Sequence, residues 1–251
     1  MRATLIEHLN ELRVRLFRVI LLLAGGMVAG WFFYLPVFNV LEDIVRANIP
    51  EGVEYDPIFI NLTAPFMLRL KMAFYIGLFF TLPFTVLQLW GFVSPGLRGH
   101  EKKPIKVVAP VSIVLFFIGA GMCWFVLPAT ITWFVTFVQA FPDTKLMPEA
   151  GMMVFLMIKM MLSFGIGFQM PIVVYFLAKF EIVTPKAMLK YWRQAIVVIF
   201  LAGAIITPSA DPFTLFALSL PLVGLFFGSV WFAQWTIKKN RNDDDELDNL
   251  D

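Results

Sequence analysis

Six stretches of this chain contain no Asp, Glu, Lys or Arg, and together they cover most of its length. A membrane helix needs about 20 apolar residues to cross a hydrocarbon core about 30 Å thick. The uncharged stretches are 19–41, 72–97, 107–142, 160–178, 194–210 and 212–237. They predict an all-α polytopic integral membrane protein with about six transmembrane helices, near 17–38, 70–92, 106–128, 152–178, 191–207 and 213–234.

Local signals limit these spans. Pro128 and the threonines after it predict that the third span ends there. We expect the fourth span to begin before Lys159. A lysine near the end of a span is tolerated, because it can extend its ammonium toward the interface. The fifth stretch would reach only roughly 25 Å as a helix. The last two spans are therefore short, and either cross the membrane or form a re-entrant hairpin around an outer turn at Pro208 and Asp211.

Two further features concern helix packing. After the first span, residues 37–45 fit a short amphipathic helix, and a loop to residue 63 completes a cap over the outer face. The pairs Gly26–Gly30 and Gly224–Gly228 have the four-residue spacing that lets membrane helices approach closely. We expect both pairs to pack helices within the chain.

The composition explains why lipid must surround the chain. Hydrophobic residues make up 59% of the 251 residues and charged residues only 15%, whereas soluble domains are near half apolar and a quarter charged. Residues 1–238 are predicted to form a single membrane domain. Residues 239–251 carry six carboxylates and are predicted to form a disordered acidic tail.

The basic residues predict the orientation. Of the 20 Lys and Arg residues, fifteen fall on the side that holds both ends and every second loop, and five on the other. Basic residues accumulate in cytoplasmic loops, so both termini are predicted to be cytoplasmic. The net charge of +2 is small and dispersed, which argues against a nucleic-acid partner.

The spans lack the residues that most membrane chemistry needs. No ionisable side chain lies near the middle of a predicted span, which disfavours the alternative function, a small-solute secondary transporter. The two histidines, His8 and His100, and the single Cys123 do not form a metal-binding pattern, and no nucleotide or nucleophile motif occurs. We therefore expect no enzyme activity, catalytic residue, metal or cofactor.

Two segments flanking the spans carry more specific patterns. In the first, a helix would place Leu9, Leu12 and Leu16 on one stripe and Glu11 one turn from Arg15. By itself this pattern indicates an amphipathic helix anchoring the first span. In the second, residues 90–103, Pro95 breaks the helix between Phe92 and Leu97, and Glu101 is the only carboxylate. By itself this indicates a glutamate balanced by neighbouring lysines.

Together the two segments resemble the TatC family, the receptor subunit of the twin-arginine protein translocation system. The first reads H-L-x-E-L-R-x-R-L from His8, and the second reads F-x-x-P-G-L-x-x-x-E-K from Phe92. Both occur at the expected places relative to the spans. A T-P-x-x-D turn from Thr207 to Asp211 also fits, so the resemblance covers the whole chain.

The resemblance implies a receptor for twin-arginine signal peptides that exports folded proteins using the proton gradient. It implies a multi-pass protein of the bacterial cytoplasmic (inner) membrane with TatA- and TatB-type single-span partners, which self-associates in a receptor complex. The implied signal-peptide-binding residues are Glu11, Glu101, Phe92, Pro95 and Leu97, supported by Arg13, Arg15 and Lys102.

The chain departs from the family pattern in its fourth span. Many relatives carry a glutamate where this chain has Gln169. Glutamine keeps the hydrogen-bonding capacity without a charge in lipid. Two roles stay open for it, a polar spot in an intramembrane pocket that receives a partner helix, or an interhelical hydrogen bond worth about 0.6 kcal/mol.

Overall fold

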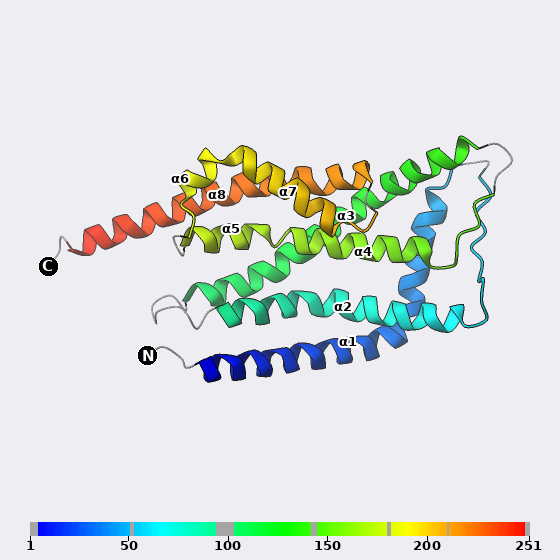
Figure 1. Ribbon diagram of the computed structural model, residues 1–251, viewed down its shortest axis with the longest axis horizontal. Helices are drawn as coiled ribbons and strands as arrows, with labels where there is room; N and C mark the ends of the chain where they lie inside the picture. Colours follow the sequence, from blue (N-terminus) through cyan, green and yellow to red (C-terminus); the bar gives the residue numbers. More distant parts are fainter. Residues whose placement is uncertain are drawn as a thin grey trace. The chain divides into compact units, whose positions relative to one another are not determined.

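The computed structural model describes residues 5–50, 53–93, 103–141, 145–179, 182–209 and 211–248, and the side chains of 10–50, 53–88, 110–141, 145–179, 182–209 and 211–235. The described chain is built of α-helices (Figure 1). It divides into two compact units, residues 1–162 and 163–251. That residues 1–238 act as one membrane domain stays a prediction.

The first helix of unit 1 is longer than predicted. Helix α1 (Leu5–Ala47) contains Pro36 and continues beyond it, and Figure 1 shows it changing direction partway along. The amphipathic segment at 37–45 is therefore the part of α1 that follows Pro36 and not a separate helix. Pro36 has no amide hydrogen to donate and its ring crowds the preceding turn, which bends a helix without ending it.

Helices α1 and α2 (Ala64–Val93) pack with their backbones nearly touching. A Cβ built on Gly30 would lie 2.5 Å from the carbonyl oxygen of Ala73, and one built on Gly26 would lie 2.8 Å from Thr81. On the facing helix, a Cβ on Gly77 would lie 2.6 Å from the backbone nitrogen of Met27. This confirms the predicted role of the Gly26–Gly30 pair, because only glycine permits such an approach.

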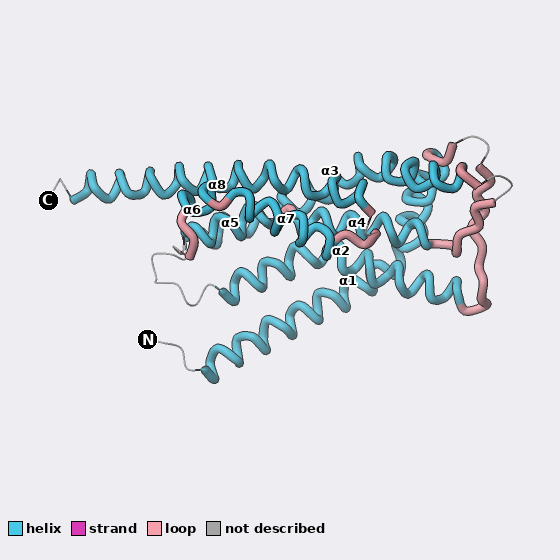
Figure 2. The backbone as a smooth tube through the Cα atoms, turned by 45° about the horizontal axis from the view of Figure 1, so that its top comes forward, coloured by secondary structure: helices cyan, strands magenta, loops and turns pink. Residues whose placement is uncertain are grey.

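The loops after α1 and after α3 (Lys103–Gln139) pair with each other at one end of unit 1. Isolated parallel bridges join Tyr55 to Leu146 and Ile58 to Glu149, and the two loops lie together in both views (Figure 1, Figure 2). The Ile58 N–H donates to Pro148 O at 3.0 Å. The cap predicted from the first loop alone is thus made of two loops.

A buried carboxylate fastens this cap to α1. Glu42 is only 7% exposed. The Tyr55 hydroxyl donates to its Oε2 at 3.3 Å, and Arg46 Nη2 lies 3.2 Å from Oε1 as an ion pair without hydrogen-bond alignment. Burial raises the pKa of Tyr55 above its usual value, and the nearby Glu42 carboxylate raises it further. Tyr55 therefore stays a neutral donor to Glu42.

Helix α3 extends beyond the limit predicted at Pro128 and ends at Gln139. The threonines that suggested a break are accommodated in the helix. The hydroxyl of Thr130 donates to Val126 O and that of Thr132 to Pro128 O, each at 3.1 Å. A proline inside a membrane helix is tolerated because nearby hydroxyls and neighbouring helices satisfy the freed backbone groups.

Helix α4 (Met152–Gly167) belongs partly to each unit. Unit 2 continues with α5 (Met170–Lys179), α6 (Pro185–Lys190), α7 (Trp192–Ile206) and α8 (Pro212–Asp248). Helices α5, α6 and α7 all contact α8. The Ser163 hydroxyl donates to Ile206 O at 2.8 Å and joins the C-terminal part of α4 to the end of α7.

Two expectations for α8 differ from the structure. The helix continues to Asp248, through most of the segment predicted as a disordered tail. No proline or glycine follows Gly228 in this helix, so each added residue extends an existing helix by one hydrogen bond. In addition, a Cβ on Gly224 or Gly228 would meet no described atom within 4 Å. This pair therefore does not pack helices within the described chain.

Five stretches are long and apolar enough to cross a membrane, namely Asn10–Ala47, Ala64–Gln88, Pro110–Gln139, Met152–Lys179 and Pro212–Trp235, and α7 is a shorter apolar helix. Many large apolar side chains on them are exposed, among them Phe32, Phe125, Ile205 and Trp231. So much exposed apolar surface would be unfavourable in water but is favourable in contact with lipid. The predicted all-α multi-span membrane fold is confirmed, but of the last two spans, both predicted to be short, only α7 is short.

Candidate functional site

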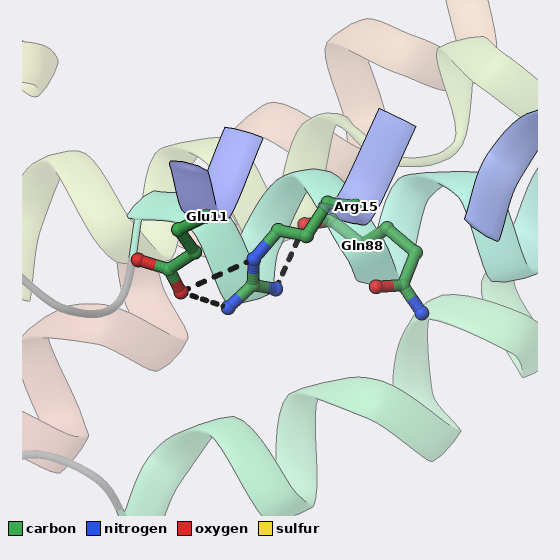
Figure 3. A network of polar contacts seen from close by, with 3 residues as sticks. All are labelled: Glu11, Arg15 and Gln88. Carbon is green, nitrogen blue, oxygen red and sulfur yellow. Dashed lines mark hydrogen bonds and ion pairs between the residues drawn. The ribbon is translucent and has the colours of Figure 1, made fainter. Parts of the chain in front are cut away.

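The N-terminal part of α1 carries an ion pair between Glu11 and Arg15 (Figure 3). The two residues are four apart, so successive helical turns bring their side chains together. Arg15 donates to Glu11 Oε1 from Nη2 at 2.5 Å and from Nε at 3.2 Å. Their side chains are 21% and 32% exposed, so the pair is only partly screened by water.

The same guanidinium links α1 to α2. Arg15 Nη1 donates to the backbone carbonyl of Gln88 at 3.2 Å (Figure 3). A helical carbonyl keeps a second lone pair after its helix bond, so this contact does not require α2 to unwind. Gln88 lies near the end of α2 at Val93. The Glu11 carboxylate is thereby held beside the end of α2 from which the second motif departs.

All of the Arg15 contacts with Glu11 use a single carboxylate oxygen. Oε2 accepts no hydrogen bond from the part of the chain that the structure describes. Arg13 lies on the same turn as Glu11 and is exposed. Glu11 can thus accept a guanidinium, and it already does so from Arg15.

An open groove begins next to this network and continues along α1 and α2. Its volume is about 680 Å³. Arg18 and Gln88 lie at the end nearest the ion pair, and the wall is otherwise apolar apart from Thr81. Gly25 also lines it, and a Cβ there would meet nothing within 4 Å. The groove can accommodate an apolar chain segment.

Several predicted residues cannot be placed. Phe92 lies in the last turn of α2, but its side chain falls outside the described residues. Pro95, Leu97, Glu101 and Lys102 also lie outside the described residues. Whether Glu101 meets Glu11 therefore stays a prediction.

Gln169 lies at the interruption between α4 and α5. Its backbone N–H bonds to Ile166 O at 3.0 Å, one residue closer than in an α-helix. Its side-chain Nε2 donates to the Gly165 carbonyl at 3.4 Å, which is the acceptor that its own backbone has left. The side chain is buried, with 6% of the residue exposed. In this contact the Gln169 side chain occupies the Gly165 carbonyl that the interrupted helix leaves open.

The turn between α7 and α8 is organised by Asp211. Its Oδ1 accepts from Thr214 N at 2.9 Å and its Oδ2 accepts from the Thr214 hydroxyl. Aspartate at the N-cap with Pro212 as first helical residue is a strongly preferred helix start. Partial burial raises the pKa of Asp211, but hydrogen bonds from Ser209 and Thr214 outweigh it, so the pKa lies below its usual value. Pro208 precedes this network in the same turn.

Sequence reasoning did not find the Gln88 carbonyl, since a backbone acceptor has no sequence signal. It also missed Glu42, which lay outside the predicted first span. The described residues contain no cluster of His, Cys, Asp and Glu suited to a metal ion.

Fold and site together define a multi-span α-helical membrane protein with a guanidinium-binding carboxylate at one end of its first helix. A model of the family described as Sec-independent protein translocase protein (TatC) matches residues 7–221. The chain belongs to the TatC family. Family membership makes it a core membrane subunit of the twin-arginine translocase, a transport component and not an enzyme.

Individual relatives agree with this assignment. The TatC protein of Xylanimonas cellulosilytica is 32% identical over 241 residues, covering 93% of this chain and 84% of that protein. The TatC protein of Koribacter versatilis is 33% identical, covering 94% and 87%. A crystal structure of a twin-arginine translocase receptor, TatC, aligns with a TM-score of 0.72 at 30% identity, covering 91% of this chain and 99% of that one. These matches do not support the secondary-transporter alternative.

Proposed function

We propose that this chain is the signal-peptide receptor of its translocase and that Glu11 binds one guanidinium of a twin-arginine signal. The observation that carries the proposal is the Glu11–Arg15 contact, in which the carboxylate holds a guanidinium through two donors. Arginine offers a planar fork of donors, whereas lysine offers a single compact charge. A partly sheltered carboxylate therefore favours arginine.

In this proposal the signal displaces Arg15 from Glu11. A helical ion pair four residues apart is worth only about 0.3–0.5 kcal/mol, so its loss costs little. Arg15 keeps its bond to the Gln88 carbonyl and remains attached to α2 after it releases Glu11. The incoming guanidinium can engage Oε2 first and then the whole carboxylate.

Glu101 is the second acceptor in the proposal, with Phe92, Pro95 and Leu97 shaping the surface and Arg13 and Lys102 ordering it. The loop that holds Glu101 leaves α2 a few residues after Gln88, and this proximity supports its convergence on Glu11. The apolar part of the signal then lies in the groove along Gly25 and Thr81. Two carboxylates match two adjacent arginines in charge.

The proposal places both termini in the cytoplasm, because fifteen of the 20 basic residues then face inward. The membrane is the bacterial cytoplasmic (inner) membrane, and the proton gradient supplies the energy. The partners are TatA- and TatB-type single-span proteins and further copies of this chain. An exposed stripe on α8, with Leu220, Gly224, Gly228 and Trp231, supports packing with a partner helix.

Binding of a fluorescent signal peptide to purified protein in nanodiscs tests the receptor role. The unaltered chain should bind a peptide with an arginine pair more tightly than one with a lysine pair. Hydrogen bonds to charged groups contribute about 1.5–3 kcal/mol, so Glu11→Gln or Glu101→Gln should weaken arginine-peptide binding roughly 10- to 150-fold. Lysine-peptide binding should change much less.

Glu149→Gln is the matched control, since Glu149 is an exposed glutamate in the loop before α4. It should leave both affinities unchanged. Equal binding of the two peptides by the unaltered chain, or an unchanged preference in both glutamate variants, would rule out the receptor assignment.

A further inference from the structure

The segment that leads from the first cap loop into α2, residues 59–62, exposes large apolar side chains (Figure 1). Phe59, Ile60 and Leu62 are all exposed, and Leu62 is 99% exposed. Contiguous apolar surface on a folded protein marks contact with another protein or with a membrane. The segment lies at the start of α2 and therefore at the far end of that helix from the Arg15–Gln88 contact.

Backbone hydrogen bonds fix this segment on both sides. Directly before it, Ile58 O accepts from Ala150 N at 2.8 Å, where the two cap loops pair. At its other end, Asn61 O accepts from Ala64 N at 3.0 Å in the turn that starts α2. The exposure of the apolar side chains is therefore a property of the fold.

The exposed surface is continuous with the lipid-facing side of α2. Phe66, Leu70 and Phe74 are exposed, and their four-residue spacing places them on one stripe of the helix. Residues 64–88 are long and apolar enough to cross a membrane, so this stripe faces lipid. Leu62 precedes Phe66 by the same four residues, and residues 57–68 contain no charged side chain. No charge therefore separates the segment from the lipid-facing stripe.

A cation beside two aromatic rings indicates how deep the segment lies. The Arg69 guanidinium lies 4.0 Å from the Trp31 ring centroid and 4.7 Å from that of Tyr34. Aromatic and basic residues gather in this way at membrane interfaces. The Phe66 and Trp31 ring centroids are 6.4 Å apart, and Leu62 lies one helical turn, about 5 Å, further out. The headgroup layer is about 5–8 Å thick on each side of the hydrocarbon, so Leu62 lies within it.

We infer that residues 59–62 bind the lipid surface, with the side chains of Phe59, Ile60 and Leu62 inserted among the headgroups. The cap is then fastened to the membrane as well as to α1, where Glu42 holds it. The leaflet is the outer one, because both termini are proposed to be cytoplasmic. A second copy of this chain could also cover apolar side chains, but continuity with the lipid-facing stripe favours lipid.

A spin label attached to the full chain in nanodiscs tests this contact. Leu62→Cys carries the label, and Cys123→Ala removes the single native cysteine, which is buried. Electron paramagnetic resonance measures collisions of the label with oxygen, which concentrates in lipid, and with a nickel chelate, which stays in water. The oxygen-to-nickel collision ratio at position 62 should be close to that of a Phe74→Cys label in the lipid-facing stripe.

Asp56→Cys is the matched control, since it places the same label on an exposed cap residue shortly before the segment. The collision ratio at position 62 should be several times that at position 56, which corrects for any affinity of the label itself for lipid. Equal ratios at these two positions would show that the segment faces water and would overturn the inference. Ile60→Cys repeats the measurement at a second exposed position, and thermal unfolding in detergent shows which variants keep the fold.

Protection of the label at position 62 from both reagents would also overturn the lipid contact. Spin–spin broadening between labels would then assign the surface to a second copy of the chain. These collision ratios do not depend on signal-peptide binding, and Glu11→Gln should leave them unchanged. Failure of this inference is therefore distinguishable from failure of the receptor proposal.

Discussion

A methyl group placed on Gly30 would lie 2.5 Å from the carbonyl oxygen of Ala73, closer than real side-chain carbons approach a carbonyl oxygen. The two helices therefore meet at backbone distance. This crossing fixes α1 against α2, and so it also fixes the Arg15 guanidinium against the Gln88 carbonyl.

Gly30→Ala should destabilise the protein because the added methyl must push α1 and α2 apart. Overpacking of this kind costs about 1–3 kcal/mol. Unfolding in detergent, followed by tryptophan fluorescence, measures the change. Gly25→Ala is the matched control, since its Cβ would meet nothing within 4 Å. Equal stability of the two variants would contradict the close crossing.

Arg15→Gln should bind an arginine-pair peptide more tightly than the unaltered chain. The substitution removes the internal guanidinium that occupies Glu11, and a helical pair four residues apart, worth about 0.3–0.5 kcal/mol, corresponds to about a twofold gain. Peptide titration in nanodiscs measures it. Arg13→Gln removes the same charge from the neighbouring exposed position and corrects for simple electrostatics. If Arg15→Gln binds no more tightly than Arg13→Gln, the displacement step is wrong.

The N-cap at Asp211 should make stability depend on pH in the acidic range. Its folded-state pKa lies below its usual value of 3.8, so the ionised form stabilises the fold. This contribution to stability is complete above the pKa that Asp211 has in the unfolded chain. It is lost as the pH falls through the lower pKa that Asp211 has in the folded protein. Asparagine can still cap the helix, but Asp211→Asn removes the negative charge at its N-terminus and should lower the stability at neutral pH by about 0.3–1 kcal/mol.

The stability difference between the Asp211→Asn variant and the unaltered chain should stay constant above the unfolded pKa and narrow below it. Urea unfolding in detergent from about pH 6 to about pH 2 covers the transition. Lys145→Gln is a suitable comparison, because its ion pair with Glu54 is exposed. A difference that widens toward low pH would contradict the sign of the Asp211 shift.

Gln169→Leu should have a modest effect on stability. The substitution removes the donor to Gly165 O, and polar contacts of this kind within membranes are worth about 0.6 kcal/mol and at most about 1.7 kcal/mol. Thermal unfolding measures the loss, and Gln169→Glu tests whether the geometry tolerates a carboxylate. A translocation defect in a stably folded Gln169→Leu protein would instead favour a binding role for the amide.

Features that depend on neighbouring residues could be predicted from the sequence, whereas contacts between distant residues could not. Uncharged runs located the spans because the hydrocarbon core of a bilayer requires a long apolar segment in each helix that crosses it. Proline was less informative. Pro128 was predicted to end the third span, but it lies inside α3, because backbone groups in a membrane must find partners and continuing the helix provides most of them.

The sequence by itself determined the multi-span membrane class of the protein, the approximate positions of its spans and the spacing that pairs Glu11 with Arg15, since each of these depends on residues at most one span apart in the chain. Only the tertiary structure decided that Arg15 also binds Gln88 O and that the loops at Tyr55 and Leu146 pair. Each of those contacts uses a backbone group of a residue that is distant in the chain. A backbone carbonyl is the same in every residue, so only the packing of the helices selects which one is used.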